Sequence, residues 1–302
     1  MTNKILVIGS INMDLVVKVE RMPKAGDTVL GTDVENFAGG KGANQAVAAA
    51  KAGGSVSMMA KLGNDAYGKE LLLDLEDVGI DTGLVETEIG SSGIAFITID
   101  AKGENMIVVS SGANRKITIQ DLGKINFSEY KFLVLQLEIP INVVKKSLEI
   151  AKANNLKTIL NVAPAQILDE EIIKNTDFLI LNEGEAALLA NKDVFDKETA
   201  IAAAKSLIVD GAKSVIVTLG ADGLIWQSPE SSGSLDAHKV NVVDTTAAGD
   251  CFCGALAVAL SENKSLKQAL EFANAAAALA TTKKGAQPSL PSRAEIEKFL
   301  AK

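Results

Sequence analysis

Short apolar runs alternate with helix-like periodic stretches along most of this 302-residue chain. The apolar runs lack a polar face, which is typical of strands buried on both sides of a parallel sheet. Candidate strands of this kind span residues 4–9, 55–61, 132–136, 158–161, 178–181 and 214–219, with 224–227 as a hairpin partner of the last. Candidate helices span residues 67–78, 142–153, 183 onward, 197–210, 248–261, 265–281 and 293–301. The alternation predicts an α/β fold in three layers, with helices flanking both faces of a parallel-sheet body.

Two segments depart from this pattern. Residues 13–37 and 93–110 alternate apolar and polar positions, which indicates strands with one exposed face. The first segment predicts two or three antiparallel strands, and the second predicts a hairpin that turns at 100–104. We expect both to form a small antiparallel β lid, inserted into a single domain over residues 1–302. Such a sheet can close over the carboxyl ends of the parallel strands, where ligands bind in open α/β sheets.

Residues 240–260, VNVVDTTAAGDCFCGALAVAL, carry the most informative pattern. The run Val240–Val243 predicts a buried strand, and a polar turn and an apolar helix follow it. Tiny residues stand where the helix begins: Ala247, Ala248 and Gly249. Because they leave the first N–H groups of the helix accessible, an anion could bind there with help from the helix dipole.

Asp250 follows these small residues in the first turn of the predicted helix. A carboxylate there would repel a bound phosphate. The conflict disappears if Asp250 faces a hydroxyl group and takes its proton, while the N–H groups hold the charge that develops. An ordinary strand–loop–helix junction, with Asp244 or Asp250 as a helix cap, explains the same residues.

A second glycine-rich segment, AGGKGAN, spans residues 38–44. It fits neither a Walker A loop nor a dinucleotide-binding fingerprint, but its glycines would let a ligand approach the backbone. Lys41 and Asn44 could then contact the ligand, or the segment could be a tight turn with an exposed lysine. Asp14, shortly after Asn12, could accept hydrogen bonds from two neighbouring hydroxyls of a polyol or be an ordinary turn aspartate.

Polar residues follow several of the predicted strands directly. Glu138 follows one, Thr218–Gly220 ends another, and Asn182 and Glu185 follow a third in the spacing N-x-x-E. These positions lie where an α/β ligand site is expected. The N-x-x-E pair could hold Mg²⁺ through water or form a capping box at a helix start, and both readings can hold together.

Composition and charge narrow the function further. The chain is 47% hydrophobic with a net charge of −8, which suits a globular protein and argues against nucleic acid or anionic membrane as the main partner. The first residues read as a strand and not as a signal peptide, so we expect a cytoplasmic protein. A single histidine, His238, excludes a histidine-rich zinc site. Cys251 and Cys253 cannot form a disulfide framework, and we expect buried thiols.

Several motifs resemble the ribokinase family of carbohydrate kinases, the PfkB type, over essentially the whole chain. AGGKGANQA at 38–46 resembles the family's N-terminal signature, and DTTAAGDCFCGAL at 244–256 resembles its C-terminal signature. Shorter matches, in order, are GSINMD at 9–14, LEIP at 137–140, NEGE at 182–185 and GAQPSLP at 285–291. CFC at 251–253 departs locally, because the family commonly has threonine or serine at its first position.

The resemblance implies ATP-dependent phosphorylation of D-ribose at O5, with Asp250 as the catalytic base. It implies an anion hole formed by the backbone N–H groups of Ala247, Ala248 and Gly249. It implies sugar contacts from Asn12, Asp14, Gly40, Lys41, Asn44, Glu138 and Asp250. It implies a nucleotide pocket formed by Asn182, Thr218, Gly220, Gly249 and Asn274, with Glu185 near Mg²⁺ through water. It implies a monovalent cation, K⁺ before others, held by Asp244, Thr246, Ala280, Lys283, Gly285 and Ser289.

The implied partners are a small-molecule sugar, ATP and a second copy of the chain, paired through the lid. Two alternatives stay open. The chain could be a kinase for another furanose or nucleoside, such as deoxyribose, fructose or pseudouridine. It could also be a non-catalytic sugar sensor on the same scaffold, although a pure binder needs no base.

Overall fold

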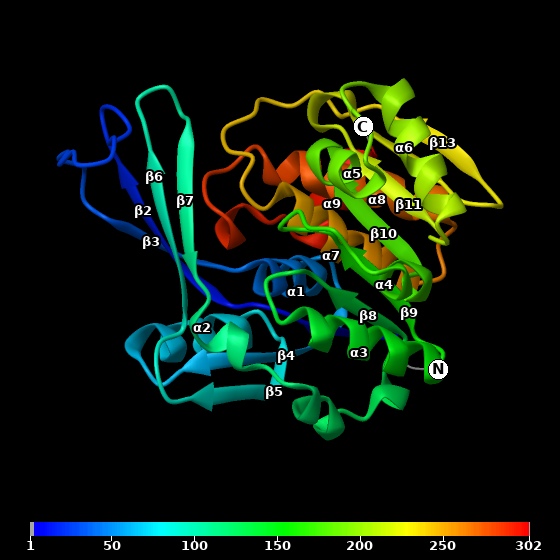
Figure 1. The fold of residues 1–302 in the computed structure, drawn as a ribbon, viewed down its shortest axis with the longest axis horizontal. Coiled ribbons are helices and arrows are strands. Elements are labelled where there is room, and N and C mark those ends of the chain that lie inside the picture. The colour runs from blue at the N-terminus through cyan, green and yellow to red at the C-terminus, as the bar shows by residue number, and fades with distance from the viewer. Residues whose placement is uncertain (1–2, 302) are drawn as a thin grey trace.

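The computed structural model describes residues 3–301, and a nine-stranded sheet forms the centre of this part of the chain (Figure 1). Its strand order is β13-β12-β11-β10-β9-β8-β1-β4-β5. The strands are β1 (Lys4–Ile8), β4 (Ser55–Gly63), β5 (Asp81–Glu88), β8 (Phe132–Leu135), β9 (Lys157–Asn161), β10 (Phe178–Asn182), β11 (Val215–Thr218), β12 (Leu224–Gln227) and β13 (Ser232–Leu235). All neighbours pair in parallel except β11–β12 and β12–β13. The predicted parallel body and its antiparallel edge hairpin are confirmed.

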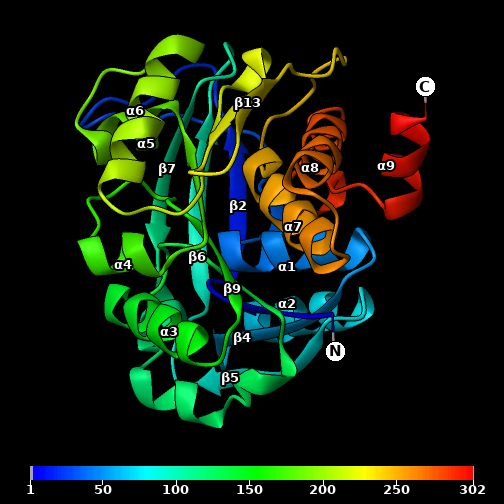
Figure 2. The same ribbon diagram turned by 90° about the vertical axis from the view of Figure 1, so that its right-hand side faces the viewer.

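Helices cover both faces of this sheet, which gives the three predicted layers (Figure 2). One face carries α1 (Lys41–Lys51), α2 (Ala66–Asp77), α7 (Ala248–Ser261), α8 (Leu266–Ala280) and α9 (Arg293–Leu300). The other carries α3 (Ile141–Ala153), α4 (Glu170–Asn175), α5 (Glu183–Ala190) and α6 (Lys197–Val209). In β1, Ile5 and Val7 join the first core while Leu6 and Ile8 join the second. A strand that is buried on both faces therefore needs the unbroken apolar run seen in the sequence.

Small residues let α1 and α7 approach each other closely. Gly254 lies in α7, and a Cβ atom built on it would lie 2.5 Å from the carbonyl oxygen of Gln45 in α1. Only glycine fits at such a distance, and the alanines around it keep both helix surfaces flat. This contact brings the first turn of α1 beside the first turn of α7.

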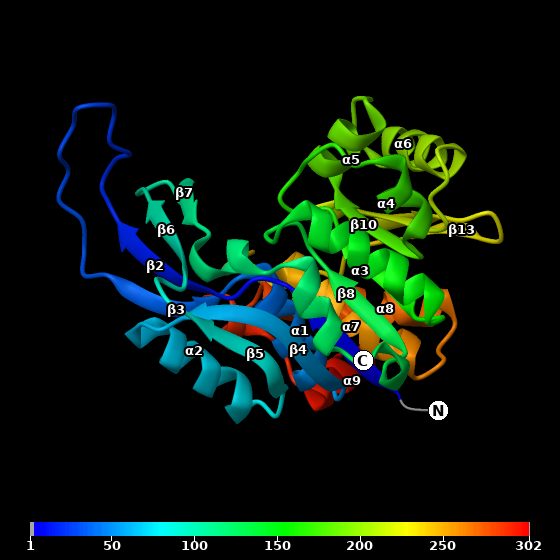
Figure 3. The ribbon, with the colours of Figure 1, turned by 60° about the horizontal axis from the view of Figure 1, so that its bottom comes forward.

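A four-stranded lid sheet projects from the body (Figures 1 and 3). It is formed by β3 (Glu35–Gly39), β2 (Asn12–Lys18), β6 (Gly93–Ile99) and β7 (Asn105–Ser110), in that order. β2–β3 and β6–β7 pair antiparallel as predicted, and the two hairpins join through a parallel β2–β6 pairing. The segment 13–37 supplies two of these strands, and only one isolated bridge, Val19 with Gly31, lies in the loop between them.

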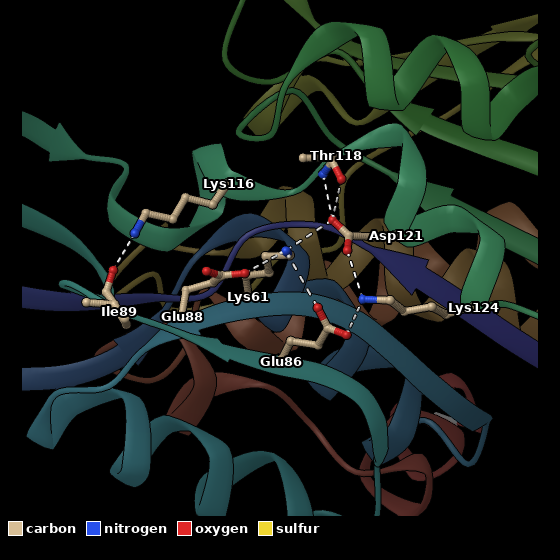
Figure 4. Close-up of polar contacts among 8 residues, drawn as sticks. All are labelled: Lys61, Glu86, Glu88, Ile89, Lys116, Thr118, Asp121 and Lys124. Atoms are coloured by element: carbon tan, nitrogen blue, oxygen red, sulfur yellow. Dashed lines mark hydrogen bonds and ion pairs between the residues drawn. The ribbon is translucent and has the colours of Figure 1, made fainter.

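An ion-pair cluster fixes the body next to the lid (Figure 4). The buried ammonium group of Lys61 lies 2.8 Å from Glu88, 3.1 Å from Asp121 and 3.6 Å from Glu86. Lys124 lies 3.0 Å from Asp121 and also pairs with Glu86. The cluster joins β4 and β5 to the segment that follows β7, so both ends of the β6–β7 hairpin start from a fixed base.

Three local predictions differ from the structure. The run Val240–Val243 is not a buried strand: Val242 and Val243 are 58% and 59% exposed. The β12–β13 hairpin occupies the sheet edge instead, and Val243 only donates its N–H to the carbonyl of Thr281. Strands β5 and β13 were not predicted, because their alternating or glycine-containing sequences lack an apolar run. Among the described residues, no helix is long and apolar enough to cross a membrane.

Candidate active site

Glu138 draws together the segments that follow β1 and β8. Its Oε2 atom accepts hydrogen bonds from the hydroxyl of Ser10 (2.6 Å), the side-chain amide of Asn12 (3.4 Å) and the backbone N–H of Lys41 (3.2 Å). These donors come from the β1–β2 connection, from the first residue of β2 and from the start of α1. A carboxylate after one strand thus fixes the loop after its neighbour, at the carboxyl edge where α/β ligand sites lie.

Gly40 makes this convergence sterically feasible. Its φ angle is +87°, and a Cβ atom there would lie 2.6 Å from the backbone nitrogen of Asn12. The predicted close approach at the glycine-rich segment is therefore present. It places the backbone of Lys41 against Glu138 and directs Asn44, one turn later, toward α7.

Asp250 lies in the first turn of α7 and is held by two side-chain amides from α1. Its Oδ2 atom accepts from Asn44 and its Oδ1 atom from Gln45, each at 3.0 Å. Burial raises the pKa of Asp250, whereas the charge of Lys41 and these two hydrogen bonds lower it. Burial alone would lower the pKa of Lys41, but the charges of Asp250, Glu138 and Glu185 raise it. The site therefore pairs one ammonium group with a group of carboxylates.

The start of α7 presents backbone N–H groups. Ala247 adopts a left-handed conformation, with φ +60°, and Cys251 is the first residue whose N–H bonds back to it, at 2.8 Å. The N–H of Ala248 is engaged with the carbonyl of Thr245 at 3.2 Å. Those of Ala247 and Gly249 have no hydrogen-bond acceptor among residues 3–301. No heavy atom lies within 4 Å of a Cβ built on Gly249, so this helix end borders open space.

Asp14 lies in β2 of the lid sheet and faces the same group of charges. Its pKa is raised to about 7, mainly by burial and further by the charges of Glu138 and Asp250, while the charge of Lys41 opposes the rise. A Cβ on Gly39 would lie 2.2 Å from Asp14 Oδ2, so the neighbouring strand needs a glycine to accept this carboxylate. Asp14 is therefore a lid residue that belongs electrostatically to the site at the body.

A cavity of about 360 Å³ opens beside Glu138, within the usual size range of small-molecule sites. Asn12 of β2 and Val109 of β7 line it from the lid sheet, and Glu138, which follows β8, lines it from the body. Asn114, where the chain returns from the lid, also lines it and donates to the side chain of Asn12 at 2.7 Å. The cavity thus lies between the two sheets.

Asn182 and Glu185 form a capping box at the start of α5. Glu185 Oε2 accepts from the N–H of Asn182, and Asn182 Oδ1 accepts from the N–H of Glu185, both at 2.8 Å. The predicted capping box is therefore present. Burial raises the pKa of Glu185. The charge of Asp250 acts in the same direction, and the charge of Lys41 opposes it. Glu185 thus also faces the charges around Asp250, which is compatible with the predicted contact to Mg²⁺ through water.

The other predicted nucleotide residues lie apart from this cluster. Thr218 donates to the carbonyl of Leu181 (3.3 Å), and Asn274 donates to that of Asp236 (2.9 Å). Gly220 has φ +50° and no heavy atom within 4 Å of a built Cβ. Within residues 3–301, no hydrogen bond joins these three to Asp250.

Asp244 joins two loops after Val243 and after α8. Its Oδ1 atom accepts from the N–H and hydroxyl of Thr246 (2.9 and 2.6 Å), and its Oδ2 atom accepts from the N–H of Gly285 (2.9 Å). Partial burial acts to raise the pKa of Asp244, but these hydrogen bonds lower it. Ser289 is fully buried and donates to the carbonyl of Ala286 at 2.7 Å. Asp244 therefore links the loop before α7 to the loop after α8, and its lowered pKa favours the ionised carboxylate.

Sequence reasoning missed several polar residues around the site. They are Ser10, Gln45, Asn114, Gln136 and Asn161, all buried and all hydrogen-bonded to one another or to predicted site residues. Gln45 could have been found as the polar residue next to Asn44 in an otherwise apolar helix. Gln136 could have been found as one of two polar residues, with Glu138, in the run FLVLQLE. Asn114 lies outside any motif.

The expected buried thiols are present. Cys251 and Cys253 lie in α7 within the first core. Burial raises the pKa of both thiols, and the neighbouring charge of Asp250 raises it further. Neither thiol is therefore poised as a thiolate nucleophile.

Comparison with known proteins agrees with this geometry. A model of the pfkB family of carbohydrate kinases matches residues 2–293. The ribokinase of Haemophilus influenzae is 40% identical over 303 residues, which cover 99% of each chain. The deoxyribokinase of Salmonella typhimurium is 36% identical over 301 residues, 98% of each chain. A solved structure of the Arabidopsis thaliana ribokinase with ribose and ATP superimposes with a TM-score of 0.92, at 33% identity over 99% of each chain. This chain belongs to the pfkB family of carbohydrate kinases.

Proposed function

We propose that this protein transfers the γ-phosphoryl group of ATP to O5 of D-ribose, giving D-ribose 5-phosphate and ADP. The observation that carries the proposal is the arrangement around Asp250. A buried carboxylate with fixed orientation stands at a helix start whose N–H groups border open space. Relatives named ribokinase, alike over nearly their whole length, support ribose as the acceptor.

In the proposed reaction, Asp250 accepts the proton of the O5 hydroxyl while O5 attacks the γ-phosphorus in line. The bond from the γ-phosphorus to the β–γ bridging oxygen breaks, and ADP leaves with that electron pair. The N–H groups of Ala247 and Gly249 hydrogen-bond the oxygens of the transferring group. The N–H of Ala248 would join this anion hole by exchanging its long bond to Thr245 for the phosphoryl oxygen.

The sugar would lie among the charges around Asp250, next to the cavity that Asn12 and Glu138 line. Asp14 and Glu138 would accept hydrogen bonds from its hydroxyls, and Lys41 would offset their charge. Asn12 and Asn44 contribute amides, and Gly40 keeps the backbone close. Because Asp14 belongs to the lid sheet, a bound sugar bridges lid and body and excludes water from the reacting atoms.

The nucleotide would bind beyond α7, toward Asn182, Thr218, Gly220, Gly249 and Asn274. Asn182 and Glu185 would reach the phosphates, and Glu185 suits Mg²⁺ because its Oε1 atom has no hydrogen-bond partner among residues 3–301. Mg²⁺, when bound through water to Glu185, supplies neutralising charge to the phosphates.

A monovalent cation would bind near Asp244, and the residues present fit it. The lowered pKa of Asp244 favours an ionised carboxylate, and the loops before α7 and after α8, which meet at the Asp244–Gly285 hydrogen bond, would supply backbone carbonyls. The proposed ligands are Asp244, Thr246, Ala280, Lys283, Gly285 and Ser289. The side-chain ammonium group of Lys283 pairs with Glu295, and that of Lys284 pairs with Glu35. These two ammonium groups therefore do not compete with a cation for the backbone carbonyls. A bound K⁺ would stiffen the loop that leads into Ala247.

We expect exchange of K⁺ for choline at constant ionic strength to lower the rate at saturating ribose by at least about fivefold, the lower end of typical coupling between sites. Na⁺ should give an intermediate or altered rate. Steady-state ADP release in the three chloride salts measures this. Asp244→Asn is the matched variant and should lose the difference between salts. Equal rates in all three salts at every ribose concentration would exclude the cation site.

The proposed function is tested by following ADP release with Mg·ATP and a panel of acceptors. We expect the highest kcat/KM for ribose, and lower values for deoxyribose, fructose and pseudouridine, since a polar site discriminates against an acceptor that leaves its groups unpaired. The 36% identity to a deoxyribokinase makes deoxyribose the strongest competitor. Calorimetric ribose binding without ADP release would support the sensor instead.

We also propose that the chain functions as one domain with the two lid segments inserted, and that two copies pair through the lid. Every residue of β7 is exposed, including Met106, Ile107, Val108 and Val109. Met106 and Val108 point to one face of β7 and Ile107 and Val109 to the other, so apolar side chains are exposed on both faces. Exposed apolar surface of this kind is typical of a region that another protein covers. A cytoplasmic location, where ATP is made and used, suits the proposed reaction.

A further inference from the structure

We infer that Gln45 is a positioning residue for Asp250: its buried amide, oriented in turn by Gln136, fixes one oxygen of the carboxylate. The inference rests on the proposed role of Asp250 as the base. It concerns two fully buried residues that are not among the proposed sugar contacts.

The side chain of Gln45 projects from α1 into the core and is 0% exposed. Its Nε2 atom lies 3.0 Å from Asp250 Oδ1 and 3.2 Å from Asn161 Oδ1. Its Oε1 atom accepts from Gln136 Nε2 at 2.7 Å. All the hydrogen-bonding atoms of this amide are therefore occupied, and none is left for a ligand.

This set of contacts permits one orientation. A carboxylate only accepts hydrogen bonds, so Nε2 of Gln45 must face Asp250 and its Oε1 must face Gln136. Gln136 then has to present Nε2, and it is itself 0% exposed. Its Oε1 atom lies 2.1 Å from where a Cβ on Gly9 would be, so the chain after β1 confines it. Gln136 therefore donates a hydrogen bond to Gln45, and Gln45 donates one to Asp250.

Asn44 holds the other oxygen of Asp250 in a different way. Its Nδ2 atom donates to Oδ2 at 3.0 Å, but its Oδ1 atom is buried without a partner among the described residues. Asn44 can therefore rotate its amide when a ligand binds, whereas Gln45 cannot. The fixed donor at Oδ1 sets the plane of the carboxylate, and Oδ2 is the oxygen left to adapt to the incoming hydroxyl.

The charges around Asp250 make this donor important. Asp14 from β2, Glu138 after β8 and Glu185 from α5 are acidic, and Lys41 from α1 is the opposing cation. Burial already raises the pKa of Asp250, and the amides of Asn44 and Gln45 oppose that rise. Without Gln45, the carboxylate would keep its proton to higher pH and would lose its fixed plane. Both effects act on the proton transfer and not on sugar contacts.

The test is the pH dependence of the full-length enzyme carrying Gln45→Met, which removes the amide at similar length. We expect kcat at pH 7 to fall about 10–100-fold, the usual weight of a hydrogen bond to a charged group. The acid limb of the kcat profile should move up by about one to two pH units. KM for ribose should stay within about threefold, because no proposed sugar contact is removed.

Gln136→Met is the second variant, since it removes only the group that orients Gln45. It should move the acid limb in the same direction by a smaller amount. Ser147→Ala is the matched control, because Ser147 in α3, like Gln136, carries a buried polar atom that has no hydrogen-bond partner among residues 3–301. Its pH profile should match that of the wild type.

A folded Gln45→Met enzyme whose acid limb stays in place would overturn the inference, even if kcat falls, because loss of packing alone does not move the limb. If that variant does not fold, an unmoved limb in Gln136→Met overturns it equally. Asp250→Asn separates the two hypotheses. Retained turnover there removes the proposed base, whereas lost turnover with an unmoved limb in Gln45→Met removes only the role of Gln45.

Discussion

Asp250→Asn should lower kcat by at least about 10²–10⁴-fold, the usual contribution of a general base. Ribose should still bind, because the proposed hydroxyl acceptors Asp14 and Glu138 are unchanged. The new side chain is nearly isosteric, and Asn44 can accommodate it. Rotation of the Asn44 amide would turn its unpartnered Oδ1 atom toward the new N–H₂ group, while Gln45 stays fixed. The variant should therefore fold with its site intact.

Single-turnover phosphoryl transfer and calorimetric ribose binding measure the two halves of this expectation. The circular dichroism spectrum and melting temperature report on folding. Because burial raises the pKa of Asp250, removing its charge should leave the melting temperature at neutral pH unchanged or higher. A variant that turns over within tenfold of the wild type would mean that the proton leaves O5 by another route.

Much of the architecture could be predicted because buried parallel strands require unbroken apolar runs. The predictions that were wrong or missing also come from this dependence on apolar runs. Val240–Val243 is an apolar run, yet a hairpin with a weaker pattern, β12–β13, occupies the sheet edge. Strand β5 lies at the other edge with one side partly exposed, so its sequence alternates and gives no continuous signal. At edges, pairing partners decide the structure more than the local sequence does.

The candidate site divides in a similar way. Residues whose role depends on backbone geometry, such as Gly40 and the small residues before Asp250, can be located from spacing. Gln45 and Gln136 can be noticed as polar residues in apolar segments, but their role cannot be assigned, because it depends on the partner that each buried amide hydrogen-bonds. Those partners are separated by 91 residues in one case and 205 in the other. Long-range polar pairing is a property of the fold, and one sequence without the fold does not contain it.

Asp14→Asn should weaken ribose binding about 100-fold or more, because two hydrogen bonds to a charged acceptor are replaced by weaker neutral ones. In the wild type, the pKa of Asp14 is raised to about 7, so near that pH the free protein carries the proton on about half of its molecules. Sugar hydroxyls donate to the ionised form, and ribose binding therefore releases a proton. Affinity should fall about tenfold per unit as the pH drops below 7 and should level off above pH 8.

Calorimetry at pH 7 in buffers of different ionisation enthalpy would detect the released proton directly, and Asp14→Asn should abolish the dependence on buffer. The stability of the folded protein should fall as the pH rises, whereas ribose affinity should increase. A folded pKa of about 7, above the ordinary 3.8, means that the contribution of this group to stability is full below about pH 4 and is lost as the pH rises through 7. At pH 8 the asparagine variant should therefore melt at a higher temperature than the wild type while binding ribose more weakly. A variant that melts lower and binds ribose as tightly would show that Asp14 supports the lid and does not hold the sugar.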